Sequence, residues 1–213
     1  MFKFTSNEIR DLIIAFIFIS LSFAIASSGR NPSAIIQILP YILVGVGAGF
    51  IFHELGHKFV SMKYGYWAEF KLWPQGLLFA LITSFFGFVF AAPGAVYTYA
   101  NHMTDEINGK ISIAGPIVNI ILALVFLAIA VMVYPSAFYS ETAITIFIAS
   151  SLGYSINSFL AVFNLLPIGN LDGSKVLNWN IGIWIVTIAI AGILTLSYMT
   201  IGVEGIVRLI IGI

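Results

Sequence analysis

The sequence lacks cysteine altogether and is poor in charged residues. Without cysteine, the chain can have no disulfide framework, no thiol chemistry and no cysteine-based zinc site. Only 8% of the residues are charged, and nine basic residues balance nine acidic ones, so no nucleic-acid partner is expected. The chain is instead 60% hydrophobic, with a mean hydropathy of +1.05. These values exclude an ordinary soluble domain and indicate a protein whose main partner is the lipid bilayer.

Several apolar runs are long enough to cross a bilayer, which takes about 20 residues. We expect spans at about 11–26, 35–62, 111–134, 142–166 and 181–200. The first run has no small-residue cleavage site, so we expect a retained span rather than a cleaved signal peptide. The tail at 201–213 is either an interfacial helix or a continuation of the last span. The predicted fold class is an all-α polytopic membrane protein with about five to six transmembrane helices.

The apolar stretch at 76–99 is less regular than these spans. It is rich in phenylalanine and β-branched residues, and it is broken by Gly87 and by Pro93-Gly94. Because these features are typical of strands and turns, we predict a membrane-dipping β-hairpin or re-entrant segment near 76–99. Irregular backbone at that depth is tolerated where it lines a cavity in the protein. A plain short transmembrane helix is the alternative.

The second predicted span carries an H-E-x-x-H pattern, His53-Glu54-Leu55-Gly56-His57, near its C-terminal end. Residues four apart lie on one face of a helix, so His53 and His57 can bind one zinc ion. Glu54 lies beside them, where it can act as a general base. So short a pattern can occur by chance. Here, however, two of only three histidines lie with a glutamate in an apolar helix, where ionisable side chains are costly and usually functional.

A catalytic zinc site normally has three protein ligands, so a third histidine or carboxylate is needed. The other candidates lie in polar loops: Glu69, Asp105, Glu106 and His102. We expect His102, the remaining histidine, to lie at the surface. Asp172 is different, because it follows the fourth span at the same predicted depth as the H-E-x-x-H pattern. We predict that Asp172 is the third zinc ligand. The alternative is a helix-capping aspartate.

The distribution of lysine and arginine predicts the orientation, because cytoplasmic loops carry an excess of both. With the N-terminus in the cytoplasm, most basic residues outside the spans lie inside the cell: Lys3, Arg10, Lys63, Lys71, Lys110 and Lys175. Only Arg30 then lies clearly outside, and the outer link at 135–141 has no lysine or arginine. We therefore expect a multi-pass protein of the cell membrane with its N-terminus and active-site mouth on the cytoplasmic side.

Three motifs follow one another between about 35 and 175. They are H-E-x-x-H at 53–57, G-P-x-x-N at 115–119, and N-x-x-P-x-x-x-x-D-G at 164–173. In this order, and at these span positions, they resemble the site-2 protease family of intramembrane zinc metalloproteases. No region has the composition of a peptide-binding PDZ domain or of a regulatory domain, so the chain resembles the minimal prokaryotic type.

The resemblance implies an endopeptidase that cleaves in or near transmembrane segments of membrane-protein substrates. It implies one zinc ion per chain, held by His53, His57 and Asp172, with Glu54 as the general base and then the proton donor. It implies that Asn119 stabilises the oxyanion or the substrate backbone, and that Asn164 helps to bind substrate. The segment at 76–99 would present a strand edge that pairs with an unwound substrate.

The predicted organisation is one integral-membrane domain over 1–213. Its catalytic core at 35–175 combines a zinc helix at 35–62, the re-entrant segment at 76–99, and helices at 111–134 and 142–166 with the Asp-Gly segment. One or two further membrane helices follow at 181–213.

Two other functions remain open from the sequence alone. The chain could be a catalytically idle protein that binds membrane clients, although an intact Glu54 argues against this. It could also be an ion or proton transporter that uses the intramembrane histidine, glutamate and aspartate cluster. Transporters often contain inverted repeats, and no convincing repeat relates the two halves of this sequence.

Overall fold

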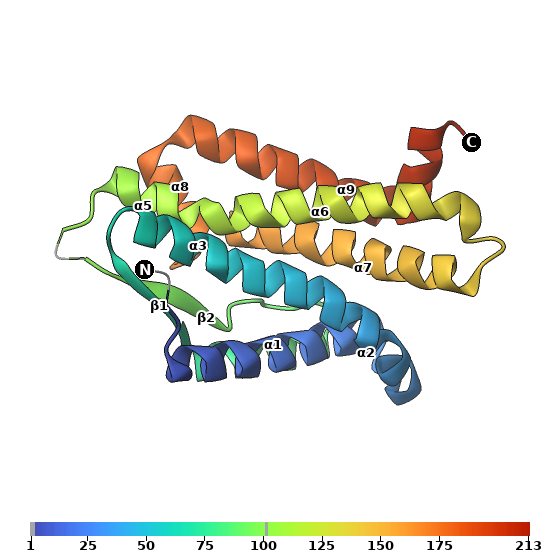
Figure 1. Cartoon of the computed structure of the whole chain (residues 1–213), viewed down its shortest axis with the longest axis horizontal. Coiled ribbons are helices and arrows are strands. Elements are labelled where there is room, and N and C mark those ends of the chain that lie inside the picture. The colour runs from blue at the N-terminus through green and yellow to red at the C-terminus, as the bar shows by residue number, and fades with distance from the viewer. Residues whose placement is uncertain (1–2, 101) are drawn as a thin grey trace.

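The computed structural model describes residues 3–100 and 102–213. Among these, five helical units are long and apolar enough to cross a membrane (Figure 1): Ser6–Ser27, Pro32–Lys63, Asp105–Ser136, Glu141–Asn164 and Ile181–Ile211. The chain is therefore an all-α polytopic membrane protein, as predicted. Each predicted span falls largely within one of these units.

The first two units lie next to each other and contribute much of the core. Helix α1 (Ser6–Ser27) is capped at its N-terminus by Thr5, whose side chain accepts a hydrogen bond from the backbone N–H of Glu8. The second unit joins α2 (Pro32–Val46), the π-helical turn η1 (Gly47–Ile51) and α3 (Phe52–Lys63). A π-turn releases backbone carbonyls from the regular helical pattern, and such turns are frequent at functional sites. One residue, Phe52, separates this turn from the H-E-x-x-H pattern.

The remaining helices complete the bundle. The third unit contains α5 (Asp105–Ser112), α6 (Ala114–Val133) and the short turn η2 (Tyr134–Ser136). It is followed by α7 (Glu141–Asn164), the short α8 (Asp172–Trp179) and α9 (Ile181–Ile211). Helices α6, α7 and α9 run alongside one another, and α5 and α8 lie together at one end (Figure 1).

Most of the tail at 201–213 belongs to the end of helix α9. Its backbone is non-helical at Gly202, with φ 66° and ψ 169°, so residues beyond this kink form a separate short leg. Val203 and Val207 of this leg are buried against a cluster that contains Tyr134. The hydroxyl of Tyr134 donates a hydrogen bond to Glu204 and accepts one from Arg208. The tail is therefore a helical continuation that a kink turns back onto the bundle.

A small antiparallel sheet is present near the predicted irregular segment. It pairs β1 (Trp67–Leu72) with β2 (Gly94–Tyr99). Between the strands lies α4 (Pro74–Ser84), and the chain then returns so that the backbone of Trp73 donates a hydrogen bond to Pro93. The stretch at 76–99 is thus helical in its first half and supplies one strand at its end. The other strand comes from the preceding polar segment.

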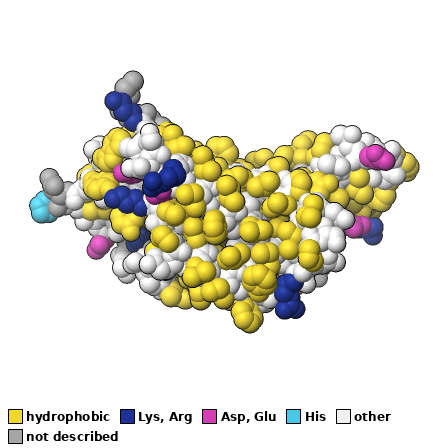
Figure 2. All heavy atoms as spheres, turned by 90° about the horizontal axis from the view of Figure 1, so that it is seen from below, with side chains coloured by type: hydrophobic (Ala, Val, Ile, Leu, Met, Phe, Trp, Pro, Cys, Tyr) yellow, Lys and Arg dark blue, Asp and Glu magenta, His cyan; other side chains and the backbone are white. Residues whose placement is uncertain are grey.

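The surface is divided as a membrane protein requires. In the view of Figure 2, hydrophobic side chains cover the middle of the molecule, and charged side chains gather toward its ends. The sheet, α5, α8 and the N-terminus lie at one end, and the α6–α7 connection and the C-terminus lie at the other (Figure 1). Lys63, Lys71, Lys110 and Lys175 belong to elements at the first end.

Candidate metal centre

Helix α3 places His53 and His57 one turn apart on the same face. Both side chains are buried, and their ring centroids lie 4.6 Å from each other. This face packs closely against α6 through glycine. A Cβ atom on Gly56 would lie 3.2 Å from the carbonyl oxygen of Ala114, and one on Gly115 would lie 2.5 Å from Nε2 of His57. The two glycines therefore let α6 approach the imidazoles directly.

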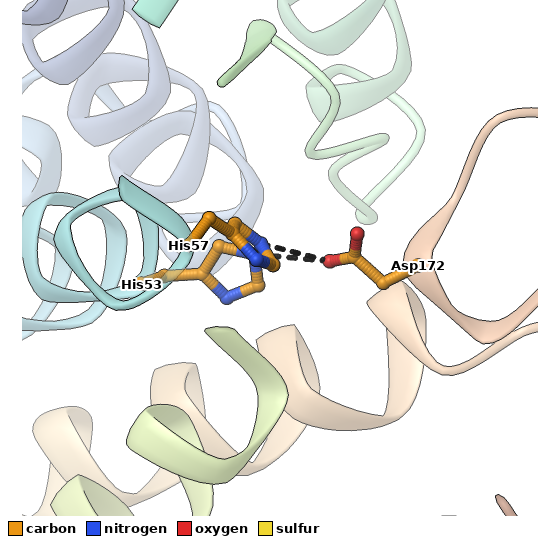
Figure 3. A group of neighbouring side chains, drawn as sticks. All are labelled: His53, His57 and Asp172. Atoms are coloured by element: carbon orange, nitrogen blue, oxygen red, sulfur yellow. Dashed lines mark hydrogen bonds and ion pairs between the residues drawn. The ribbon is translucent and has the colours of Figure 1, made fainter. Parts of the chain in front are cut away.

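Asp172 faces the two histidines from another part of the chain (Figure 3). Its Oδ2 lies 3.4 Å from Nε2 of His53 and 3.1 Å from Nε2 of His57, and the two Nε2 atoms are 3.0 Å apart. In a tetrahedral zinc site, where each ligand lies about 2.0–2.1 Å from the metal, neighbouring ligand atoms are about 3.3 Å apart. The three side chains therefore have the spacing that one tetrahedral ion requires.

The hydrogen bonds of the two Nδ1 atoms determine which nitrogen of each imidazole faces Asp172. Nδ1 of His53 lies 2.6 Å from Oδ1 of Asn119, and Nδ1 of His57 lies 2.8 Å from the carbonyl oxygen of Ile111. Both partners are acceptors, so both Nδ1 atoms carry protons. Each neutral ring then directs the lone pair of Nε2 toward the carboxylate of Asp172. Three acceptor atoms thus point toward one another, and a cation bound between them would offset their mutual repulsion. Two histidines with fixed tautomers, together with a carboxylate, are a suitable ligand set for zinc.

Asp172 is brought to this position by the break between α7 and α8. It is the first residue of α8, whose N-cap is Leu171, so its side chain does not occupy the capping position. A Cβ atom on Gly173 would collide with the carbonyl of Leu165, so glycine allows α8 to start against the end of α7.

Glu54 lies beside the histidines but on a different face of α3. Its side chain is buried, and its Oε2 has no hydrogen-bond partner among the residues that the structure describes. His53, Asp172, Lys175 and the backbone N–H of Val96 are all close enough to act on its carboxylate. A buried carboxylate oxygen without a partner is costly. Glu54 thus has an uncommitted acceptor next to the three converging ligand atoms.

Strand β2 presents its outer edge to Glu54. The N–H groups of Phe70 and Leu72 in β1 donate to side chains of α1, and hence point away from β2. Their register partners are Val96 and Gly94. In an antiparallel pair, residues opposite such positions also point away from their partner. The N–H and C=O groups of Val96 and Gly94 therefore lie on the free edge of the sheet, which no third strand of the described chain covers, and the backbone of Val96 faces the Glu54 carboxylate there.

Asn119 and Asn157 form a buried network behind His53. Both are fully buried. The amide nitrogen of Asn119 donates to the carbonyl of Gly49 and to Oδ1 of Asn157, each at 3.0 Å, which directs its Oδ1 to His53. Asn157 in turn donates to the carbonyls of Gly45 and Gly153. The network thus bonds the carbonyl of Gly49 in the π-turn and orients an imidazole. Sequence reasoning missed Asn157, although an asparagine inside a predicted span is itself a signal.

The group of converging ligand atoms among the described residues does not include the other candidate residues. The side chain of Asn164 donates a hydrogen bond to the carbonyl of Leu160 at the end of α7. His102 is exposed, and the hydroxyl of Tyr66 donates to its backbone carbonyl. Glu69 lies in β1, and Asp105 and Glu106 begin α5. The structure therefore brings together His53, His57 and Asp172, with Glu54 beside them and Asn119 behind His53.

Comparison with known proteins gives two curated relatives. The chain is 42% identical over 200 residues to "Putative zinc metalloprotease MJ0611" of Methanocaldococcus jannaschii, and the alignment covers 93% of this chain and 96% of the relative. It is 28% identical over 155 residues to "Putative zinc metalloprotease YwhC" of Bacillus subtilis, and this alignment covers 67% of this chain and 69% of the relative. No family model matches the chain. No solved structure matches it either.

Proposed function

The chain belongs to the zinc metalloprotease family of MJ0611, and from this premise we propose that it is an intramembrane endopeptidase of the site-2 protease type. Its substrates would be membrane proteins, cut in or near their transmembrane segments. One zinc ion per chain would be bound by His53, His57 and Asp172.

The observation that carries this proposal is the convergence of three acceptor atoms among apolar helices. The Nε2 atoms of His53 and His57 and a carboxylate oxygen of Asp172 all lie within 4.8 Å of one another. The histidines belong to a unit that is long and apolar enough to span a membrane. Ionisable groups at membrane depth are expensive and are usually functional. A peptidase site at this position would act on peptide bonds that the bilayer otherwise shields from water.

The proposed chemistry divides between a bound zinc ion and the side chain of Glu54. A zinc ion bound here would supply Lewis acidity, because it polarises the scissile carbonyl and makes water a stronger nucleophile. Glu54, with its free Oε2, would accept a proton as the water oxygen attacks the carbonyl carbon. Glu54 would then give this proton to the leaving nitrogen as the C–N bond breaks. The products are a carboxylic acid and an amine, which become a carboxylate and an ammonium group when the remaining proton passes from the acid to the amine.

The free edge of β2 is the proposed binding surface for the substrate backbone. A helical peptide bond is shielded by its own hydrogen bonds, so a substrate must be unwound before water can attack it. An extended segment could add to the sheet at the outward groups of Gly94 and Val96. Because the backbone of Val96 lies near the Glu54 carboxylate, this pairing would place a peptide bond beside the proposed base.

The arrangement also supports the proposed orientation and location. The candidate site is near the end of the molecule that carries the sheet, α5 and α8, where four of the lysines lie. In the cell membrane, the excess of basic residues would place this end in the cytoplasm. The mouth of the active site would then open toward the cytoplasmic side.

The test begins with the metal and ends with the reaction. Detergent-purified wild-type protein should contain about one zinc ion per chain, and His57→Ala should contain far less. Glu54→Gln should keep its zinc but lose cleavage of single-span test proteins reconstituted with it in vesicles. Cleavage by Glu54→Gln at the wild-type rate would refute the proposed base. No zinc in folded wild-type protein would favour a client-binding or transport function instead.

A further inference from the structure

One face of α3 connects the proposed base to the sheet. Glu54, Lys58 and Ser61 lie at positions i, i+4 and i+7, so they form a stripe along one side of the helix. The hydroxyl of Ser61 lies 2.9 Å from that of Thr98 in β2. Lys58 lies on the β1 side, 5.6 Å from the ring of Trp67. The residues that contact the sheet therefore share a face with Glu54.

Lys58 forms a buried ion pair with the start of α1. Its Nζ lies 2.5 Å from Oε2 of Glu8, and both side chains are only 1% exposed. The other carboxylate oxygen of Glu8 accepts a hydrogen bond from the backbone N–H of Phe70 at 3.1 Å. One carboxylate thus joins the zinc helix, the first helix and β1. His57, a candidate zinc ligand, directly precedes Lys58 in the sequence.

Asp11 extends this connection along β1. Its Oδ2 accepts a hydrogen bond from the backbone N–H of Leu72, and Thr5 bonds the side chain of Glu69. Glu8 and Asp11 are three residues apart on one face of α1, and Phe70 and Leu72 are two apart on one edge of β1. The two carboxylates therefore occupy the acceptor positions that a third strand would otherwise fill. This edge of the sheet is closed by α1.

We propose that the Glu8–Lys58 pair is a positioning device that sets the free edge of β2 relative to Glu54 and the histidines. The inference rests on the proposed function, because it assigns to α1 the task of fixing the register of a substrate strand. Removal of the pair would let the sheet shift on α3, and a peptide bond other than the usual one would then lie beside Glu54. Neither Glu8 nor Lys58 would touch the substrate.

The nature of the pair favours positioning over simple stabilisation. Two charges lose much of their hydration when they are buried, so apolar residues of similar volume often give equal or greater stability. Apolar packing, however, is not directional. A lysine and a carboxylate bonded to a backbone N–H fix both the distance and the direction between α3 and β1. A device of this kind should affect accuracy more than folding.

The absence of cysteine allows a clean test by spin labelling. We would introduce cysteines at Ile36 in α2 and Tyr97 in β2, both exposed, and measure the distance between the two labels. Ile36 belongs to the same helical unit as α3, and about 25 residues of helix separate it from the level of the sheet, so the distance should be on the order of 40 Å. The wild-type background should give one narrow distribution.

The variants are Lys58→Met, Glu8→Gln and the double variant, and Lys63→Met is the matched control. Lys63 is an exposed lysine of the same helix. In each variant of the pair, the distance distribution should at least double in width while zinc content stays near wild type. The single-span test protein that the wild type cleaves should be cut at additional peptide bonds, as seen by mass spectrometry. Lys63→Met should resemble wild type in all three measurements.

The outcomes separate this inference from the proposed function. A wild-type distance distribution and a single cut position in folded Lys58→Met would overturn the positioning role. Restoration of both in the double variant would also overturn it, because packing alone would then suffice. If the wild type neither holds zinc nor cleaves, the proposed function fails, while the distance measurement still reports on the sheet.

Discussion

Gly115→Ala is the substitution for which the structure makes the sharpest prediction. A Cβ atom at this position would lie 2.5 Å from Nε2 of His57 and 2.6 Å from Nε2 of His53. The added methyl group would therefore meet the two atoms that are proposed to bind zinc. Alanine is otherwise a better helix former than glycine, so α6 itself should not suffer.

The size of the effect follows from the overlap. Ordinary contact begins at 3.4 Å, so the imidazole of His57 would have to retreat by about 0.9 Å, and His53 by about 0.8 Å. Both rings are held from behind by Asn119 and the carbonyl of Ile111, so neither has free space to retreat into. A misplacement of about 1 Å at a catalytic constellation can cost on the order of 100-fold. We expect zinc affinity to fall by at least this factor.

The assay is competition for zinc with a chelator of known affinity, followed by measurement of the metal retained per chain. Gly192→Ala is the matched control, because a Cβ atom there has nothing within 4 Å. It should bind zinc like the wild type. If folded Gly115→Ala also retained zinc at wild-type affinity, Nε2 of His53 and His57 could not both be ligands in the arrangement described.

Three further predictions concern other parts of the molecule. Asn157→Leu should lower zinc affinity about 10- to 100-fold in the same competition assay, because Asn119 loses the partner that orients it toward His53; unchanged affinity would exclude the network from the site. Gly202→Ala should lower the free energy of unfolding by about 1–3 kcal/mol, since its backbone conformation is almost restricted to glycine, and thermal denaturation in detergent would show this. Removal of zinc by a chelator should lower the unfolding temperature of the wild type, and added zinc should restore it in a concentration-dependent way; a chelator that had no effect would argue against a tightly bound ion.

The spans could be predicted from the sequence because the bilayer imposes a length and a composition on each of them. The short elements at the membrane surface were harder. Strand β1 alternates between exposed and buried positions, but its lysine, glutamate and tryptophan also suit a membrane interface. Interface composition and a short amphipathic strand produce the same residues, so only the pairing with β2 identifies the strand. The helical first half of 76–99 was obscured for a similar reason, because short apolar runs do not reveal their type.

The candidate metal centre was predictable to the extent that its residues lie in motifs. The i, i+4 spacing of His53 and His57 is enough to place both imidazoles on one face of a helix. The approach of Asp172 depends on how α8 starts against α7, which no local pattern states. Interactions between distant segments that lie outside the motifs were missed, and the Glu8–Lys58 pair is the clearest case. A charged residue near a predicted span end is ordinarily solvated, so its burial depends on contacts 50 residues away.

Buried side-chain atoms without a hydrogen-bond partner give a final reason to assign proton transfer to Glu54. Three buried side-chain oxygens among residues 3–100 and 102–213 have no hydrogen-bond partner, and two of them are serine hydroxyls, Ser20 and Ser151. Hydroxyls are neutral and can rotate, so leaving them unpaired costs far less than leaving a carboxylate unpaired. Asn119 and Asn157 show that this bundle does satisfy buried polar groups when their task is structural. An unpaired oxygen on Glu54, beside three converging ligand atoms and a free strand edge, therefore favours an acceptor kept available for a reaction proton.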